Sequence, residues 1–250
     1  MTGRPLVVVH RDKALLAEAA AARLATAIVD AQAARGEADI VLTGGSMGSA
    51  ILEALGRSAL RDAADWGAVT IWWGDERFVP TGDGDRNETQ AREALLDALP
   101  LDPARVHPMA GSDRAGSPEE AADLYAGQLA QASGGQGDVP GFDVVMLGVG
   151  PDAHIASLFP GHPALSATGS TVGVHESPKP PPERVSLTFD ALGRGVQLWF
   201  LVAGQDKADA VERSLGGAPR DAAPAGSVEG TSATIWLLDA DAAGLLPKSC

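Results

Sequence analysis

The chain has 250 residues, 45% of them hydrophobic, which is enough to bury a substantial core in one α/β domain or in two small ones. Its formal net charge is −14, from 33 acidic against 19 basic residues, and this balance disfavours functions that depend on nucleic acid or on anionic membranes. The only cysteine is Cys250, so the composition excludes a disulfide framework and a cysteine-based metal centre.

Strands and helices alternate in the predicted structure. In chain order we expect a strand at 6–10, a helix at 12–36 capped by Asp12, a strand at 38–43, a helix at 47–60, a strand at 69–73, helices at 87–99 and 117–132, strands at 142–147, 171–175, 185–189 and 196–202, a helix at 206–215 and a strand at 233–238. Repeated strand, loop and helix units predict a mostly parallel central sheet between two layers of helices. The expected fold is therefore a doubly wound, Rossmann-like α/β/α arrangement, with residues 1–250 as a single domain.

The location of the protein is predicted from its apolar segments. The first residues lead directly into a Val-rich strand, and no apolar stretch approaches the ~20 residues of a membrane span. We therefore expect a cytoplasmic protein, acting as a monomer or a small homo-oligomer, with no membrane or nucleic-acid partner.

The first candidate site segment is Thr43-Gly44-Gly45-Ser46, between a predicted strand and a predicted helix. Ligands of open α/β sheets bind beyond the carboxyl ends of the strands, and a glycine-rich turn at a helix start can present backbone N–H groups to an anion. Gly44, Gly45 and Ser46 are thus a candidate phosphate-binding site. An ordinary tight turn is the alternative interpretation. The segment matches neither the dinucleotide fingerprint nor the Walker loop, which argues against NAD and ATP.

Charged residues follow the next apolar strand, at Gly74-Asp75-Glu76-Arg77. Arg77 is suited to bidentate contact with phosphate, and Asp75 or Glu76 can orient that arginine or accept sugar hydroxyls. A solvated turn with an internal ion pair is the alternative interpretation.

A histidine stands in the glycine-rich loop after the strand at 142–147, in Gly148-Val149-Gly150-Pro151-Asp152-Ala153-His154. Histidine is the side chain that exchanges protons near neutral pH, and a carboxylate can hold its tautomer. His154 is therefore a candidate general base oriented by Asp152; the alternative is a structural loop histidine.

The other histidines are weaker candidates. We expect His10, His107 and His175 to be structural or exposed, and His162 to be intermediate because it is close to His154 in the sequence. No two histidines are spaced i, i+4 as in metal-binding helices, so the sequence predicts no metal site.

Scarce lysines mark two further candidate loops, because the chain has only four: Lys13, Lys179, Lys207 and Lys248. Lys179 lies within the proline-rich stretch 178–182 and Arg184 follows it. We expect this stretch to be a stiff loop in the polyproline conformation, so that little entropy is lost when the cations bind an anion. Lys207 follows the strand at 196–202. The alternatives are a protease-resistant surface loop for Lys179 and a helix-surface position for Lys207.

No serine stands in a Gly-x-Ser-x-Gly nucleophile elbow. Base-assisted attack by water is then the chemistry that these residues favour over an acyl-enzyme mechanism.

Four of these segments, in order, resemble the 6-phosphogluconolactonase family, within the group that includes glucosamine-6-phosphate deaminases. They are 44–46, 73–80, 142–163 and 177–184, so the resemblance covers nearly the whole chain. It implies hydrolysis of 6-phospho-D-glucono-1,5-lactone to 6-phosphogluconate in the pentose phosphate pathway, without a cofactor. His154 would activate water and Asp152 would orient it. Phosphate and the developing oxyanion would be held by Gly44, Gly45, Ser46, Arg77, Lys179, Arg184 and Lys207. The sequence leaves open which of these residues holds which of the two charges.

The chain departs from the family pattern at two places. Met47-Gly48 stands where members usually have Thr-Pro, which removes a hydroxyl but keeps the backbone seat. Ala153 stands where Asp-Gly-His is usual, a small change unless that position needs a positive φ.

Two other functions are weighed against this one. A glucosamine-6-phosphate deaminase would be expected to show an acidic Asn-Glu-Pro type segment after the histidine, whereas the chain has Ser157-Leu158-Phe159-Pro160. A catalytically silent sugar-phosphate sensor would need an attached DNA-binding segment, which is not seen, and would not need His154.

Overall fold

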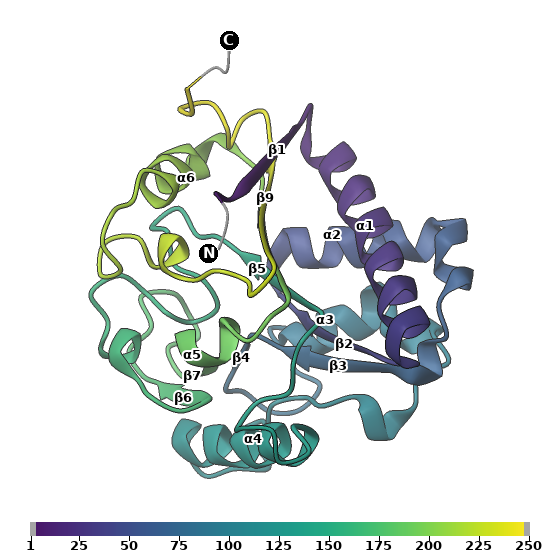
Figure 1. Ribbon diagram of the computed structural model, residues 1–250. Helices are drawn as coiled ribbons and strands as arrows, with labels where there is room; N and C mark the ends of the chain where they lie inside the picture. The colour runs from purple at the N-terminus through teal and green to yellow at the C-terminus, as the bar shows by residue number, and fades with distance from the viewer. Residues whose placement is uncertain (1–3, 248–250) are drawn as a thin grey trace.

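A six-stranded parallel sheet forms the centre of the protein in a computed structural model that describes residues 4–247 (Figure 1). Its strand order is β1-β9-β8-β5-β2-β3, and every neighbouring pair is parallel. The strands are β1 (Leu6–His10), β2 (Ala38–Leu42), β3 (Val69–Trp73), β5 (Val144–Gly148), β8 (Gln197–Val202) and β9 (Ala233–Asp239). The predicted mostly parallel sheet is confirmed, with strand ends that differ by one or two residues.

Helices cover both faces of this sheet. One face is covered by α1 (Lys13–Arg35), α2 (Gly45–Arg57) and α3 (Asn87–Ala94), and the other by α4 (Pro118–Ala132), α5 (Phe189–Leu192) and α6 (Ala208–Leu215). Successive strand residues point to opposite faces, so Ile40 and Leu42 pack with the first layer of helices while Val41 packs with the second. The expected three-layer α/β/α fold is therefore confirmed.

The helix ends reflect local signals in the sequence. Asp12 caps α1 as expected, since its Oδ1 accepts the N–H of Leu15 at 2.8 Å. The helices predicted at 47–60 and 87–99 extend too far, because α2 ends at Arg57 and α3 at Ala94, and each is followed by a tighter 3-10 turn. Such turns lie at Ala59–Ala63, Trp66–Ala68, Leu96–Ala98, Pro103–Arg105, Pro163–Ser166, Gln205–Lys207 and Pro224–Ser227.

A second, antiparallel sheet was not expected. It joins β4 (Asp75–Arg77), β7 (Arg184–Leu187) and β6 (Thr171–Val174), so two predicted strands lie outside the central sheet and the charged segment after β3 is itself a strand. Gly74 connects the two sheets, because its N–H donates to Leu42 and its carbonyl accepts from Leu187. Three-residue pairing of this kind depends on partners distant in sequence, which a local hydrophobic pattern does not indicate.

The proline-rich stretch forms a closed loop and not a straight polyproline segment. Ser177 N–H donates to the carbonyl of Pro182 at 3.0 Å, which folds the chain back on itself between β6 and β7. The polyproline conformation predicted for residues 178–182 is thus wrong, because this hydrogen bond bends the segment, while the stiffness of the loop stays a prediction.

Two further points concern membrane-spanning helices and the residues at the end of the chain. Across residues 4–247, no helix has the length and apolar character needed to cross a membrane. Lys248 and Cys250 lie outside the described residues.

The carboxyl ends of β2 and β5 lie side by side at the centre of the sheet. The chain leaves β2 through α2 on one face, whereas the segment that follows β5 packs on the other face, so a crevice is expected between the two ends. Thr43 Oγ1 accepts the N–H of Gly148 at 3.1 Å and links them. The loops predicted to hold the site start at this point.

Candidate active site

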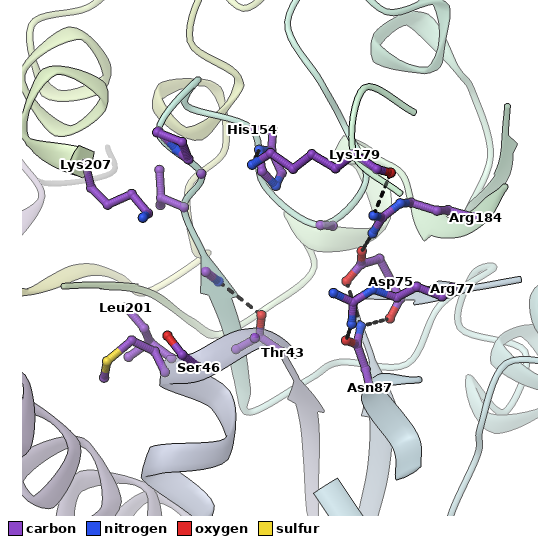
Figure 2. Close-up of a pocket in the computed structure, with 18 of the residues that line it drawn as sticks. Thr43, Ser46, Asp75, Arg77, Asn87, His154, Lys179, Arg184, Leu201 and Lys207 are labelled. Carbon is purple, nitrogen blue, oxygen red and sulfur yellow. Dashed lines mark hydrogen bonds and ion pairs between the residues drawn. The ribbon is translucent and has the colours of Figure 1, made fainter. Parts of the chain in front are cut away.

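A cavity of about 340 Å³ opens at the carboxyl ends of β2, β5 and β8, beside β4 (Figure 2). Nine of the predicted site residues line it: Gly44, Gly45, Ser46, Asp75, Arg77, His154, Lys179, Arg184 and Lys207. The tenth, Asp152, contacts the ring of His154. Segments as far apart along the chain as Gly44 and Lys207 therefore meet around a space of the size that takes one small ligand.

The start of α2 forms one end of the cavity. Gly44 is the N-cap and has no side chain with which to cap the helix, so the first N–H groups of this 13-residue helix are available to a ligand. The helix dipole adds positive partial charge at the same place. This end of the cavity can therefore bind an anion through backbone atoms alone.

His154 and Asp152 form a close pair on the loop after β5. Nδ1 of His154 lies 2.5 Å from Asp152 Oδ1, and the ring packs at 4.5 Å against that of Phe159. A Cβ at Gly150 would lie 2.0 Å from His154 Nδ1, so this contact requires a glycine there. Since Nδ1 is occupied by Asp152, Nε2 is the ring nitrogen left to meet a ligand.

The charge state of Asp152 is set by its neighbours. Burial raises the pKa of Asp152, but the hydrogen bond with His154 and the charges of His154 and Lys179 outweigh burial and hold this pKa well below its ordinary value. Asp152 is therefore an ionised partner for the imidazole at neutral pH.

Ala153, between these two residues, has a φ of 70° and is fully buried. The left-handed region suits glycine and costs an L-residue roughly 1–2 kcal/mol. The backbone between Asp152 and His154 thus has a positive φ, which favours glycine, and the chain adopts it with an alanine.

Lys179 extends from the proline-rich loop to the same pair. Its Nζ lies 3.3 Å from His154 Nδ1 and 3.6 Å from Asp152 Oδ1. Figure 2 shows the side chain of Lys179 extending to His154. Burial lowers the pKa of Lys179, Asp152 raises it, and Lys207 and Arg184 lower it further, with a net decrease. Lys207 reaches the cavity from the start of α6 and pairs with Asp206.

Arg184 is buried and holds the proline-rich loop in place. Its guanidinium donates to the carbonyls of Pro181, Lys179 and Pro180 at 3.1 to 3.2 Å. Burial, the largest effect, lowers its pKa. Arg184 therefore fixes the backbone that carries Lys179, in addition to lining the cavity.

The carboxylate of Asp75 is occupied by protein groups. Oδ2 accepts the hydroxyl of Ser157 at 2.7 Å and lies 3.9 Å from Arg184, while Oδ1 accepts from the side chain of Asn87 at 3.2 Å. Asp75 thereby joins β4, α3 and the loop that follows His154. This arrangement favours a supporting role for Asp75 over acceptance of sugar hydroxyls.

Sequence reasoning missed three polar residues here: Thr43, Asn87 and Ser157. Thr43 and Asn87 line the cavity, and Ser157 is fully buried behind it. Thr43 belongs to the glycine-rich segment and could have been found from it. Asn87 and Ser157 carry no local motif, because their importance comes from contacts with Asp75.

The remaining histidines lie away from the cavity. His107 stacks on Trp72 at 4.0 Å, and His10 contacts the carbonyl of Leu238. His175 is half-exposed between Glu119 and Glu183, and His162 contacts the backbone of His175. Within residues 4–247, no three His, Cys, Asp or Glu side chains are arranged to hold a metal ion.

Comparison with known proteins places this geometry in a family. The model of glucosamine-6-phosphate isomerases/6-phosphogluconolactonase matches residues 11–236. The chain belongs to this family. It is 56% identical to the 6-phosphogluconolactonase of Streptomyces coelicolor, over 100% of this chain and 97% of that protein.

Solved structures agree on the fold. The 6-phosphogluconolactonase of Trypanosoma brucei superposes with a TM-score of 0.83 at 29% identity, over 97% of this chain and 99% of that one. A monomeric glucosamine-6-phosphate deaminase superposes with a TM-score of 0.80 at 20% identity, over 96% and 99% of the two chains. Because both activities occur on this fold, the fold alone does not choose between them.

Proposed function

We propose that His154 activates the water that opens the lactone ring of 6-phospho-D-glucono-1,5-lactone. The overall reaction, hydrolysis of this lactone to 6-phospho-D-gluconate in the oxidative pentose phosphate pathway, is the one implied by the name of the full-length relatives. The observation that carries the proposal is the His154–Asp152 pair at 2.5 Å in a cavity that also holds a helix start and four cationic side chains.

The proton transfers follow from the free nitrogen of His154. Nε2 removes a proton from water as the water oxygen adds to the lactone carbonyl, and the ionised Asp152 stabilises the imidazolium that forms. The tetrahedral intermediate then breaks its bond between the carbonyl carbon and the ring oxygen. The imidazolium returns its proton to that oxygen, which becomes a hydroxyl, and the acid product ionises.

We assign the cationic side chains to two negative charges, the phosphate of the substrate and the oxyanion that develops during the reaction. Lys179 lies beside His154, so we assign it to the oxyanion that develops at the lactone carbonyl. Arg77 and the backbone of 44–46 are assigned to the phosphate, since Arg77 donates to Asn87, whose side chain lies against Gly44 at the start of α2. Lys207 adds positive charge from the β8 side, and Arg184 supports the loop of Lys179.

The expectations about cofactors, cellular location and oligomeric state stay predictions. The reaction as written balances without a cofactor or a metal ion. A small phosphorylated lactone is the proposed ligand, and a cytoplasmic location and a monomer or small homo-oligomer are predicted from the sequence alone.

The proposal is tested by measuring lactone hydrolysis with the spontaneous rate subtracted, because this lactone also opens by itself. We expect the purified chain to accelerate proton release from 6-phospho-D-glucono-1,5-lactone well above that background. Ammonia release from glucosamine 6-phosphate, measured in parallel, is expected to be absent. Hydrolysis at the spontaneous rate, or ammonia release in place of it, would overturn the proposal.

A further inference from the structure

Asn87 is the first residue of α3 and lines the cavity although only 2% of it is exposed. Its backbone N–H donates to Glu76 Oε1 at 2.7 Å, and the N–H of Glu88 donates to the other oxygen of the same carboxylate at 2.9 Å. Glu76 therefore caps α3 from the buried strand β4. The backbone of Asn87 is fixed before its side chain makes any contact.

The side-chain amide of Asn87 has one orientation that satisfies its neighbours. Nδ2 donates to the carbonyl of Asp75 at 2.8 Å and to Asp75 Oδ1 at 3.2 Å. Both partners are acceptors, so the NH₂ group must face Asp75 and the oxygen must face the other way. Arg77 meets that oxygen, donating from its guanidinium to Asn87 Oδ1, as the dashed lines of Figure 2 show.

The same oxygen also lies against the start of α2. A Cβ added to Gly44 would come within 1.7 Å of Asn87 Oδ1, so the backbone of Gly44 and the amide of Asn87 are in close contact. Asn87 thus touches both groups assigned to the phosphate, the α2 start and Arg77. In the described part of the chain its oxygen is the only hydrogen-bond acceptor for the guanidinium of Arg77, whose Nε is buried without a partner.

We infer that Asn87 is a positioning residue that holds the guanidinium of Arg77 against the start of α2 and so sets the affinity for the phosphate group. The inference rests on the proposed function for the identity of the substrate. Without Asn87, the guanidinium of Arg77 would lose its contact with the amide oxygen and would have to be ordered by the ligand itself, at the cost of binding energy.

A double-mutant cycle tests this role. We expect Asn87→Ala to raise KM for the phosphorylated lactone about tenfold, with kcat nearly unchanged and with little effect on the unphosphorylated lactone. Arg77→Ala is expected to act in the same way. The double variant should bind no worse than Arg77→Ala alone, because Asn87 acts through Arg77.

Controls separate positioning from general damage to α3. Gln90→Ala removes a side chain of the same helix that bonds to Gly84, away from the cavity, and should leave KM unchanged. Asn87→Ser keeps a polar helix start and replaces Asn87→Ala if that variant does not fold. Dissociation constants for inorganic phosphate and for 6-phosphogluconate give a readout that does not depend on turnover.

The outcomes distinguish this inference from the proposed function. If the unmodified chain does not hydrolyse the lactone, the proposed function fails, while a weaker phosphate affinity in Asn87→Ala still supports the positioning role. If the unmodified chain is active but the Asn87 variants bind phosphate normally, or their effect multiplies with that of Arg77→Ala, the positioning role is wrong.

Discussion

The cavity has two walls, one that carries His154 and one that carries Arg77, and the two are held in place in different ways. His154 is oriented by residues close to it in sequence, since Asp152 and Gly150 lie within four positions. Arg77 is oriented by Asn87, which is fixed in turn by Asp75 and Glu76 across two elements. On the proposed function, the group held by its own loop exchanges protons with the ligand, and the group held by the buried network binds a charge. A satisfied buried network is rigid, which keeps that group in one place.

Removal of the imidazole proposed as the general base should produce the largest effect. We expect His154→Ala to reduce kcat by about 10²- to 10⁴-fold, the usual contribution of general acid–base catalysis, while 6-phosphogluconate still binds. Steady-state kinetics with the spontaneous rate subtracted, together with titration calorimetry, measures both quantities. A variant with unmodified turnover would remove His154 from the chemistry.

Loss of the orienting carboxylate should be the next largest effect. Asp152→Asn is expected to lower kcat by less than His154→Ala does, because the imidazole stays in the cavity but loses the carboxylate that orients it. Steady-state kinetics with the spontaneous rate subtracted measures this loss of kcat. A kcat equal to that of the unmodified chain would show that Asp152 does not act on His154.

Truncation of the opposite wall should change binding and leave chemistry intact. Arg77→Ala is expected to raise KM for the phosphorylated lactone by about 10- to 100-fold, the effect of losing a charge-assisted hydrogen bond. The KM for glucono-1,5-lactone should barely change. Equal effects on the two lactones would remove Arg77 from the phosphate site.

Ala153 offers the smallest effect and tests the strain in the His154 wall. In Ala153→Gly, relief of the left-handed backbone, worth roughly 1–2 kcal/mol, is opposed by loss of a buried methyl and by the greater freedom of glycine when unfolded. We therefore expect the free energy of unfolding to change by less than about 1 kcal/mol. Ala153→Val, which places a branched side chain at positive φ, should be clearly less stable in the same denaturant titration.

The difference between the walls also explains what the sequence could predict. His154 and Asp152 form a local motif after a strongly buried strand, so spacing alone singled them out. Gly44-Gly45-Ser46 and Lys179 were found because glycine-rich turns and scarce lysines stand out. The central sheet followed from hydrophobic runs, each of which is a local signal.

The features that were missed depend on contacts across the fold. β4 has only three residues and pairs with a strand more than a hundred positions later, so no local pattern indicates it. Asn87 was identified only as a helix start, because its role comes from Asp75, Arg77 and Gly44 meeting there. Such residues become visible only when the elements that carry them are placed together.

One ratio tests the division between the two walls most directly. It is kcat/KM for 6-phospho-D-glucono-1,5-lactone divided by kcat/KM for glucono-1,5-lactone, with spontaneous hydrolysis subtracted, in the unmodified chain, in Asp152→Asn and in Arg77→Ala. We expect the ratio to be unchanged in Asp152→Asn, where both lactones lose turnover alike, and to fall about 10- to 100-fold in Arg77→Ala. A ratio that falls in Asp152→Asn, or stays constant in Arg77→Ala, would contradict the account.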